Sequence, residues 1–292
     1  QGGKINAVGT PDKPIVMTSE KEEPGAWGGI HICGRAHTNA EGGKGSSEIG
    51  GAVYGGNDDA DNSGTLQYIR LEYTGFAFDE EHEANGISFY SVGNGTIVDH
   101  CQAYKGSDDG FEFFGGSVNV SNLVAVSCSD DSFDWTEGWN GKGTNLVAYQ
   151  EAESTLGYDC DCLMECDNNG SNNAATPVAH PVLKNLILVG NGGSKQGIRL
   201  RAGTEVEIDN AKVCGKGQPL TVETALTENA LKNGTSKLTN ITLTAELSSK
   251  EGIYTHADFI AVTSNKVDAN LSYSSFEDIR KECSWMNGSW VK

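Results

Sequence analysis

Basic residues are scarce in this sequence, in which 21 Lys and Arg stand against 40 Asp and Glu and give a formal net charge of −19. Nucleic acids and anionic membrane surfaces bind through clusters of Lys and Arg, so the composition argues against both as partners. An acidic surface suits solubility, divalent cations or sugars held by carboxylates. The same charge is also compatible with a solvated exterior that binds nothing.

Long apolar runs and the common catalytic signatures are missing as well. No stretch approaches the roughly 18 apolar residues of a membrane helix, so no transmembrane span is expected. The HExxH, GxSxG and P-loop motifs are absent, and no Cys/His cluster has zinc spacing. Helical heptads are absent too, which argues against a coiled coil.

Cysteine is present in an even number, eight, and three of the eight fall between Cys160 and Cys166. In a chain rich in Gly, Asn and Ser, this pattern favours an exported protein with some disulfides. Cys101 and Cys128 each lie in an apolar strand pattern and are expected to be buried free thiols. Gln1 opens directly on a Gly-rich strand pattern, which is typical of a mature or trimmed product.

One pattern occurs twice between residues 108 and 150. DDGFEF from Asp108 is followed 22 residues later by DDSFDW from Asp130, and NLVA from Asn122 is followed 23 residues later by NLVA from Asn145. A step of this size with strand-like content is the signature of stacked coils. Because the pattern returns in the same direction, the strands are expected to be parallel rather than hairpin-paired. We therefore predict an all-β fold, a right-handed parallel β-helix.

Asparagine marks the register of these coils. Asn122, Asn145, Asn185 and Asn210 each stand at the same place in a similar strand pattern, with steps of 23, 40 and 25 residues. Stacked Asn side chains that hydrogen-bond along the axis stabilise parallel strands. The sequence therefore predicts an Asn ladder that begins at Asn122.

We predict one domain, residues 1–292, with two long loop insertions. The segments 35–64 and 151–181 have no clear periodicity and are expected to be these insertions. An open solenoid end must be covered, and the aromatic-rich segment 257–292 is the expected C-terminal cap.

Several strings resemble a group of secreted or surface-anchored bacterial proteins, common in Bacteroidota and marine bacteria and labelled hypothetical proteins or lipoproteins. They are WGGIHICG, GGNDDADNSGTLQYIRLEYTG, NGISFYSVGNGTIVDH, DDGFEFFGGSVNVSNLVAV and DDSFDWTEGWNGKGTN. The resemblance covers residues 1–150 strongly and 180–292 weakly. It implies a right-handed parallel β-helix at the cell surface, and the chain departs from the group in its abundant cysteine.

Alternate side chains of a strand face opposite sides. If the aromatic residues beside them face the core, one polar residue per coil faces outward, and these residues form one column with a spacing of about 4.8 Å. The expected members are Ser88, Glu112, Asp134, Glu165 and Arg199. Such a column resembles the place where β-helix polysaccharide lyases and galacturonases carry their carboxylates.

The column has three possible roles. Glu112, Asp134 and Arg199 are the candidates for catalysis, since carboxylates one or two coils apart approach the spacings of glycosidase pairs. The carboxylates and the arginine could instead bind calcium or a uronate, or form a neutralised ladder that faces solvent. Trp139, in a Gly-rich turn, is the candidate for stacking on a sugar. Together with it, the candidate ligand-binding residues are Glu112, Asp134, Glu165 and Arg199.

The doublets Asp108-Asp109 and Asp130-Asp131 stack in the turns before these strands. Like charges one coil apart repel each other, so either solvent screens them or a cation lies between them. We predict Ca²⁺ as the possible cofactor, because calcium prefers several oxygen ligands.

The sequence thus favours an extracellular or outer-membrane surface protein that acts as a non-catalytic binding or scaffold module. Its expected partner is a surface glycan or another cell-surface protein. A polysaccharide lyase or glycoside hydrolase is the first alternative, and a stalk or filament subunit that self-associates end to end is the second.

Overall fold

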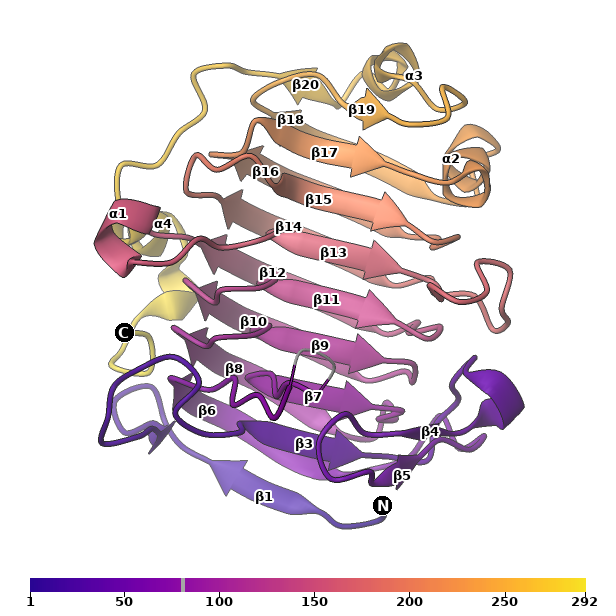
Figure 1. The fold of residues 1–292 in the computed structure, drawn as a ribbon. Coiled ribbons are helices and arrows are strands. Elements are labelled where there is room, and N and C mark those ends of the chain that lie inside the picture. The colour runs from indigo at the N-terminus through magenta and orange to yellow at the C-terminus, as the bar shows by residue number, and fades with distance from the viewer. Residues whose placement is uncertain (80–81) are drawn as a thin grey trace.

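The computed structural model describes residues 1–79 and 82–292, whose strands wind into a solenoid with two long parallel sheets (Figure 1). The ten-stranded sheet runs through β1 (Ile5–Val8), β6 (Gly64–Glu72), β8 (Ile97–Tyr104), β10 (Asn119–Val126), β12 (Lys142–Tyr149), β14 (Val182–Val189), β16 (Glu207–Cys214), β18 (Lys237–Leu243) and β20 (Lys266–Val267), with β2 (Ile15–Met17) also paired to β6. The eight-stranded sheet runs through β3 (Ile30–Cys33), β7 (Ile87–Tyr90), β9 (Phe111–Phe114), β11 (Phe133–Thr136), β13 (Met164–Asp167), β15 (Gln196–Arg201), β17 (Gln218–Val222) and β19 (Ser248–Ser249).

The chain alternates between the two sheets, one strand in each per coil. In Figure 1 the front strands run to the right and the rear strands to the left while the coils rise, which is a right-handed winding. The predicted right-handed parallel β-helix is therefore confirmed. None of the helices in the described ranges is long and apolar enough to cross a membrane.

Aromatic side chains stack along the core between the sheets. Phe89 stacks on Phe113 with ring centroids 4.9 Å apart, and Phe111 stacks on Phe133 at 5.6 Å. These residues are buried while Glu112 between them faces outward. The coil-to-coil spacing of parallel strands brings like residues into contact, which explains why the sequence repeats aromatic residues at the same position.

The Asn ladder is confirmed on the ten-stranded sheet. The side-chain amide of each member donates to the Oδ1 atom of the preceding one, from Asn145 to Asn122 at 2.8 Å, from Asn185 to Asn145 at 3.1 Å and from Asn210 to Asn185 at 2.9 Å. All four have φ between 55° and 64°. Asn is among the residues that best tolerate this left-handed backbone, so the ladder position selects Asn for both its backbone and its amide.

The two insertions differ from the predicted structureless loops. The first contains the 3₁₀ helix η1 (Glu41–Gly43) and an antiparallel pair, β4 (Gly45–Ser46) with β5 (Val53–Tyr54). The second is not one loop, because β13 pairs with β11 and β15 in the middle of it. The long step from Asn145 to Asn185 is therefore one coil with an enlarged loop, containing α1 (Glu153–Leu156), before β13 and another after it.

The predicted C-terminal cap divides into two parts. Phe259 of α3 (His256–Ala261) packs into the main core near the last strands and closes that end of the solenoid. After β20 the chain turns back along the side of the solenoid (Figure 1), where α4 (Phe276–Glu282) and η2 (Ser284–Met286) cover the ten-stranded sheet. Trp290 and Met286 pack there against an outward apolar face that includes Val124 and Val147. This part of the segment is a lateral cover rather than an end cap, because the valine face beneath it would otherwise contact water.

One further helix, α2 (Ala225–Lys232), follows β17.

All eight cysteines are free thiols, and seven of them are buried. The expected disulfides are thus not formed in the structure, because most of the cysteines pack as small apolar side chains. Cys101 and Cys128 are buried free thiols, as expected.

Candidate functional site

The predicted outward column is present in the register of the eight-stranded sheet. Ser88 of β7 pairs with Glu112 of β9, and Glu112 with Asp134 of β11. Asp134 pairs with Glu165 of β13, and Glu165 with Arg199 of β15. The column follows from the alternation of each strand, whose neighbouring aromatic and aliphatic residues face the core.

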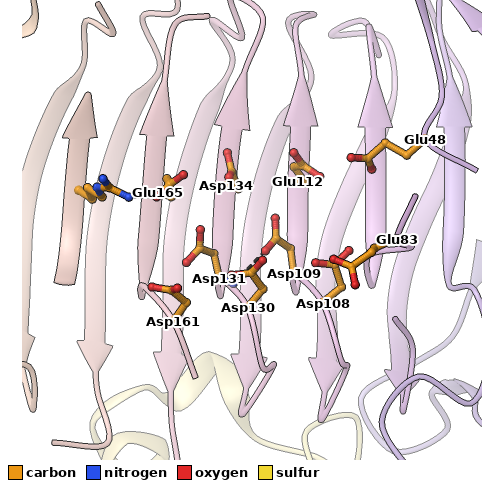
Figure 2. Close-up of a pocket in the computed structure, with 11 residues that line it drawn as sticks. Glu48, Glu83, Asp108, Asp109, Glu112, Asp130, Asp131, Asp134, Asp161 and Glu165 are labelled. Atoms are coloured by element: carbon orange, nitrogen blue, oxygen red, sulfur yellow. Dashed lines mark hydrogen bonds and ion pairs between the residues drawn. The ribbon is translucent and has the colours of Figure 1, made fainter. Parts of the chain in front are cut away.

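A second set of carboxylates lies beside this column, at the starts of the strands (Figure 2). Asp109 and Asp131 form an inner row, and Asp108, Asp130 and Asp161 form an outer row. Asp161 stands four residues before Glu165, as Asp130 stands before Asp134, so the repeat itself could have revealed it. The sequence prediction missed it because cysteines interrupt the pattern.

Two further acids reach the site from loops. Glu48 lies between β4 and β5 in the first insertion, and Glu83 lies in the loop before β7. Neither belongs to a repeat, so no signal in the sequence could have placed them. Together with Arg199, the ten acids line a cavity of about 400 Å³, here called the acidic groove: Glu48, Glu83, Asp108, Asp109, Glu112, Asp130, Asp131, Asp134, Asp161 and Glu165.

Backbone hydrogen bonds hold the inner row in place. Oδ1 of Asp109 accepts from the backbone N–H of Asp131 at 2.8 Å, and Oδ1 of Asp131 accepts from the N–H of Cys162 at 2.6 Å. The buried amide of Asn85 donates to Oε2 of Glu112 at 2.6 Å. In Asp109, Asp131 and Glu112, one carboxylate oxygen is therefore held by a hydrogen bond from the protein. The second oxygen takes no part in that hydrogen bond.

Positive charge is concentrated at one end of the acidic groove. Arg199 donates to Glu165 at 2.9 Å and to Glu223 at 3.2 Å, and Lys195 pairs with Asp161. Within the described ranges, no Lys or Arg pairs with the seven acids Glu48, Asp108, Asp109, Glu112, Asp130, Asp131 and Asp134.

A sequence model described as a pectate-lyase-like β-helix domain matches residues 1–291. The chain belongs to this family. No curated protein and no solved structure gave a significant match. The bacterial group, the surface location and the lipoprotein character implied by the resemblance stay predictions.

The raised pKa values of the groove acids follow from their burial and from repulsion between neighbouring carboxylates. Desolvation, followed by repulsion from neighbouring acids such as Asp130, raises the pKa of Asp108 to about 7. The same causes raise the pKa of Glu48 to about 7 and that of Asp130 to about 6. Burial and mutual repulsion hold four further pKa values well above the ordinary range, those of Asp109, Glu112, Asp131 and Asp134.

Three groups of side chains in the groove have the spacing that a metal ion requires. Asp108, Asp109 and Asp130 form the first group, and their ligand atoms lie within 4.8 Å of one another. The other two groups are Asp109 with Glu112 and Asp134, and Asp131 with Cys162 and Glu165. Two oxygens that bind one Ca²⁺ at 2.3–2.6 Å are at most about 5 Å apart, so the spacing in the two groups made only of carboxylates is compatible with this ion. The predicted metal ligands thus lie together, although Asp131 belongs to a different group from the other three.

Trp139 is the one predicted ligand-binding residue that lies outside the groove. It is 1% exposed, its ring stacks on Phe113 at 4.1 Å, and its Nε1–H donates to the carbonyl of Val118. The prediction that it stacks on a sugar is therefore wrong. The turn that carries it folds inward, because the core between the sheets accepts another aromatic ring at that position.

Proposed function

We propose that the acidic groove binds Ca²⁺ and, through the bound ions, an acidic polysaccharide built from uronates, and that the protein is a non-catalytic glycan-binding module. The observation that carries this proposal is a set of seven carboxylates in one cavity, three of them buried, that form no ion pair with a Lys or Arg in the described ranges. Cations supply the charge that the described part of the chain does not provide there.

Protonation is the alternative way to relieve the repulsion, and it competes with cation binding. The pKa values of Glu48, Asp108 and Asp130, about 6 to 7, imply that these three carboxyl groups lose their protons close to neutral pH. Metal ligands must be deprotonated, so a cation displaces these protons when it binds. Calcium is the preferred ion because two of the three groups offer only carboxylate oxygens.

A polyuronate suits the cation-loaded groove for two reasons. Membership of a pectate-lyase-like family supports a carbohydrate ligand. A chain of carboxylates would be repelled by the groove alone, whereas calcium ions can bridge uronate and protein carboxylates. The glycan specificity therefore depends on the cation. We further propose, with the same family support, that the protein is exported and meets this ligand at the cell surface.

Catalysis is the second candidate, because Glu112 and Asp134 lie opposite each other one coil apart. An acid–base pair, however, needs environments that separate two pKa values. Burial and repulsion raise the pKa of both carboxyl groups, so neither is set apart as the base. Arg199, the third candidate for catalysis, is held by Glu165 and Glu223. These contacts favour binding over reaction.

A glycan array with added Ca²⁺ or with EDTA tests the proposal, using the wild type and the double variant Glu112→Gln/Asp134→Asn. We expect calcium-dependent binding of uronate glycans by the wild type and its loss in the variant. The control Glu20→Gln/Glu23→Gln removes the same charge from an exposed loop and should bind as the wild type does.

Reducing-end and unsaturated-product assays on the bound glycans separate binding from catalysis. Product formation that disappears in Glu112→Gln/Asp134→Asn but persists in the control would establish the enzyme instead. Uronate binding that is equally strong in EDTA would contradict the cation-dependent mechanism.

A further inference from the structure

A second cavity lies on the ten-stranded sheet, away from the sheet that carries the acidic groove. It has a volume of about 210 Å³ and lies between the Asn ladder and the returning C-terminal segment. Asn145, Asn185 and Asn210 line it from the ladder, and Glu282 and Trp285 line it from the C-terminal segment. A cavity of this size suits a ligand of about one sugar ring.

The ladder amides have unused hydrogen-bonding capacity. An Asn side chain carries two N–H donors and an acceptor oxygen, and each of Asn145, Asn185 and Asn210 donates once to its predecessor. No other hydrogen bond joins these side-chain donors to the ranges of the chain that the structure describes. Oδ1 of Asn210 likewise accepts from no group in those ranges. The cavity is therefore lined by a row of amide donors, one per coil.

The remaining walls of the cavity are apolar or carry no net charge. Val147 and Ile187 contribute apolar surface, and the half-buried indole of Trp285 contributes an aromatic ring. Lys212 and Glu282, the charged residues of the lining, form an ion pair with each other. A charged ligand has no unpaired counter-charge here, whereas a neutral ligand that combines hydroxyls with a C–H face matches every wall.

We propose that this cavity is a binding site for a neutral saccharide, independent of calcium and of the acidic groove. The hydroxyls of the sugar bond to the amides of Asn145, Asn185 and Asn210, and its apolar face packs against Trp285. The site depends on the C-terminal segment, which therefore does more than cover the sheet.

Isothermal titration in EDTA with glucose, galactose, mannose and N-acetylglucosamine tests the proposal. We expect saturable binding of at least one of them, and affinities about tenfold weaker in Trp285→Ala and in Asn185→Gly, since a lost aromatic or hydrogen-bonded contact is worth about one factor of ten. Glycine is chosen because Asn185 has φ 60°.

The matched control is Asn240→Gly. Asn240 has φ 56° and donates to Asp209 at 2.6 Å, but it lies outside the cavity. This variant should bind sugar as the wild type does. No binding of any of the four sugars at about 10 mM, or an equal loss in Asn185→Gly and Asn240→Gly, would overturn the proposal.

Discussion

Without divalent cations, the folded protein should lose stability as the pH rises from about 4 to about 7, because the groove acids must then ionise next to one another. A carboxyl group whose pKa is raised by folding stabilises the folded state below its ordinary pKa. That contribution is lost as the pH rises through the raised value. Burial and the neighbouring acids raise the pKa of Asp108 from 3.8 to about 7, so the window lies between these two values.

The size of the effect follows from the same shift. At about 1.36 kcal/mol for each tenfold change in proton affinity, the rise in the pKa of Asp108 corresponds to about 4 kcal/mol of stability lost by neutral pH. For a chain of this size, that loss lowers the melting temperature by roughly 10 °C. The other groove acids add to the effect but not independently, because they titrate together.

Melting curves across this pH range in EDTA, for the wild type and for Asp108→Asn, measure the effect. Acids with lowered pKa values, such as Asp99, lose their contribution at lower pH. The pKa of His31 is lowered by burial and opposes the trend in both proteins, so the difference between the two proteins isolates the groove. Saturating Ca²⁺ at about 100 times its dissociation constant should restore about 2.7 kcal/mol per site. The same change of melting temperature with pH in the wild type and in Asp108→Asn would refute the reasoning.

Substitutions at two further residues test the fold that positions the site. Asn122→Ala should lower the free energy of unfolding by about 3 kcal/mol, because Asn122 forms hydrogen bonds with Asp99 and Asn145 and has positive φ. Asn122→Gly should lower it by about 1 kcal/mol less, because glycine adopts positive φ without strain. Chemical denaturation measures both, and equal losses would show that the backbone contributes nothing. Trp139→Ala should lower stability by about 3–5 kcal/mol while the folded variant keeps the calcium affinity of the wild type, as titration can check. A stable Trp139→Ala protein that had lost calcium binding would contradict the core position of this residue.

The sequence was sufficient to predict the coil repeat, the ladder and the outward column. Each depends on a local pattern that returns at a fixed step, such as the aromatic–acid–aromatic triplets around Glu112 and Asp134. Parallel strands place equivalent residues opposite each other, so a repeated pattern fixes neighbours in space.

The remaining parts depend on contacts that no repeat encodes. Glu48 reaches the groove from an insertion with its own hairpin, and Trp139 turns inward because of the space beside Phe113. The segment around Trp290 returns to the side of the solenoid because it covers a valine face that the strands alone would leave exposed to water. The pattern of one strand could show which of its faces is apolar, but it could not show which distant segment covers that face.

Calcium titration calorimetry at neutral pH, in two buffers of different ionisation enthalpy, tests the central claim most directly. We expect the wild type to bind at least one Ca²⁺ and to release protons as it does so, because acids such as Asp108 and Glu48 have raised pKa values near 7. Glu112→Gln/Asp134→Asn should bind more weakly, and Glu20→Gln/Glu23→Gln should bind as the wild type does. The absence of calcium binding at millimolar concentration, or an equal loss in both double variants, would contradict the account.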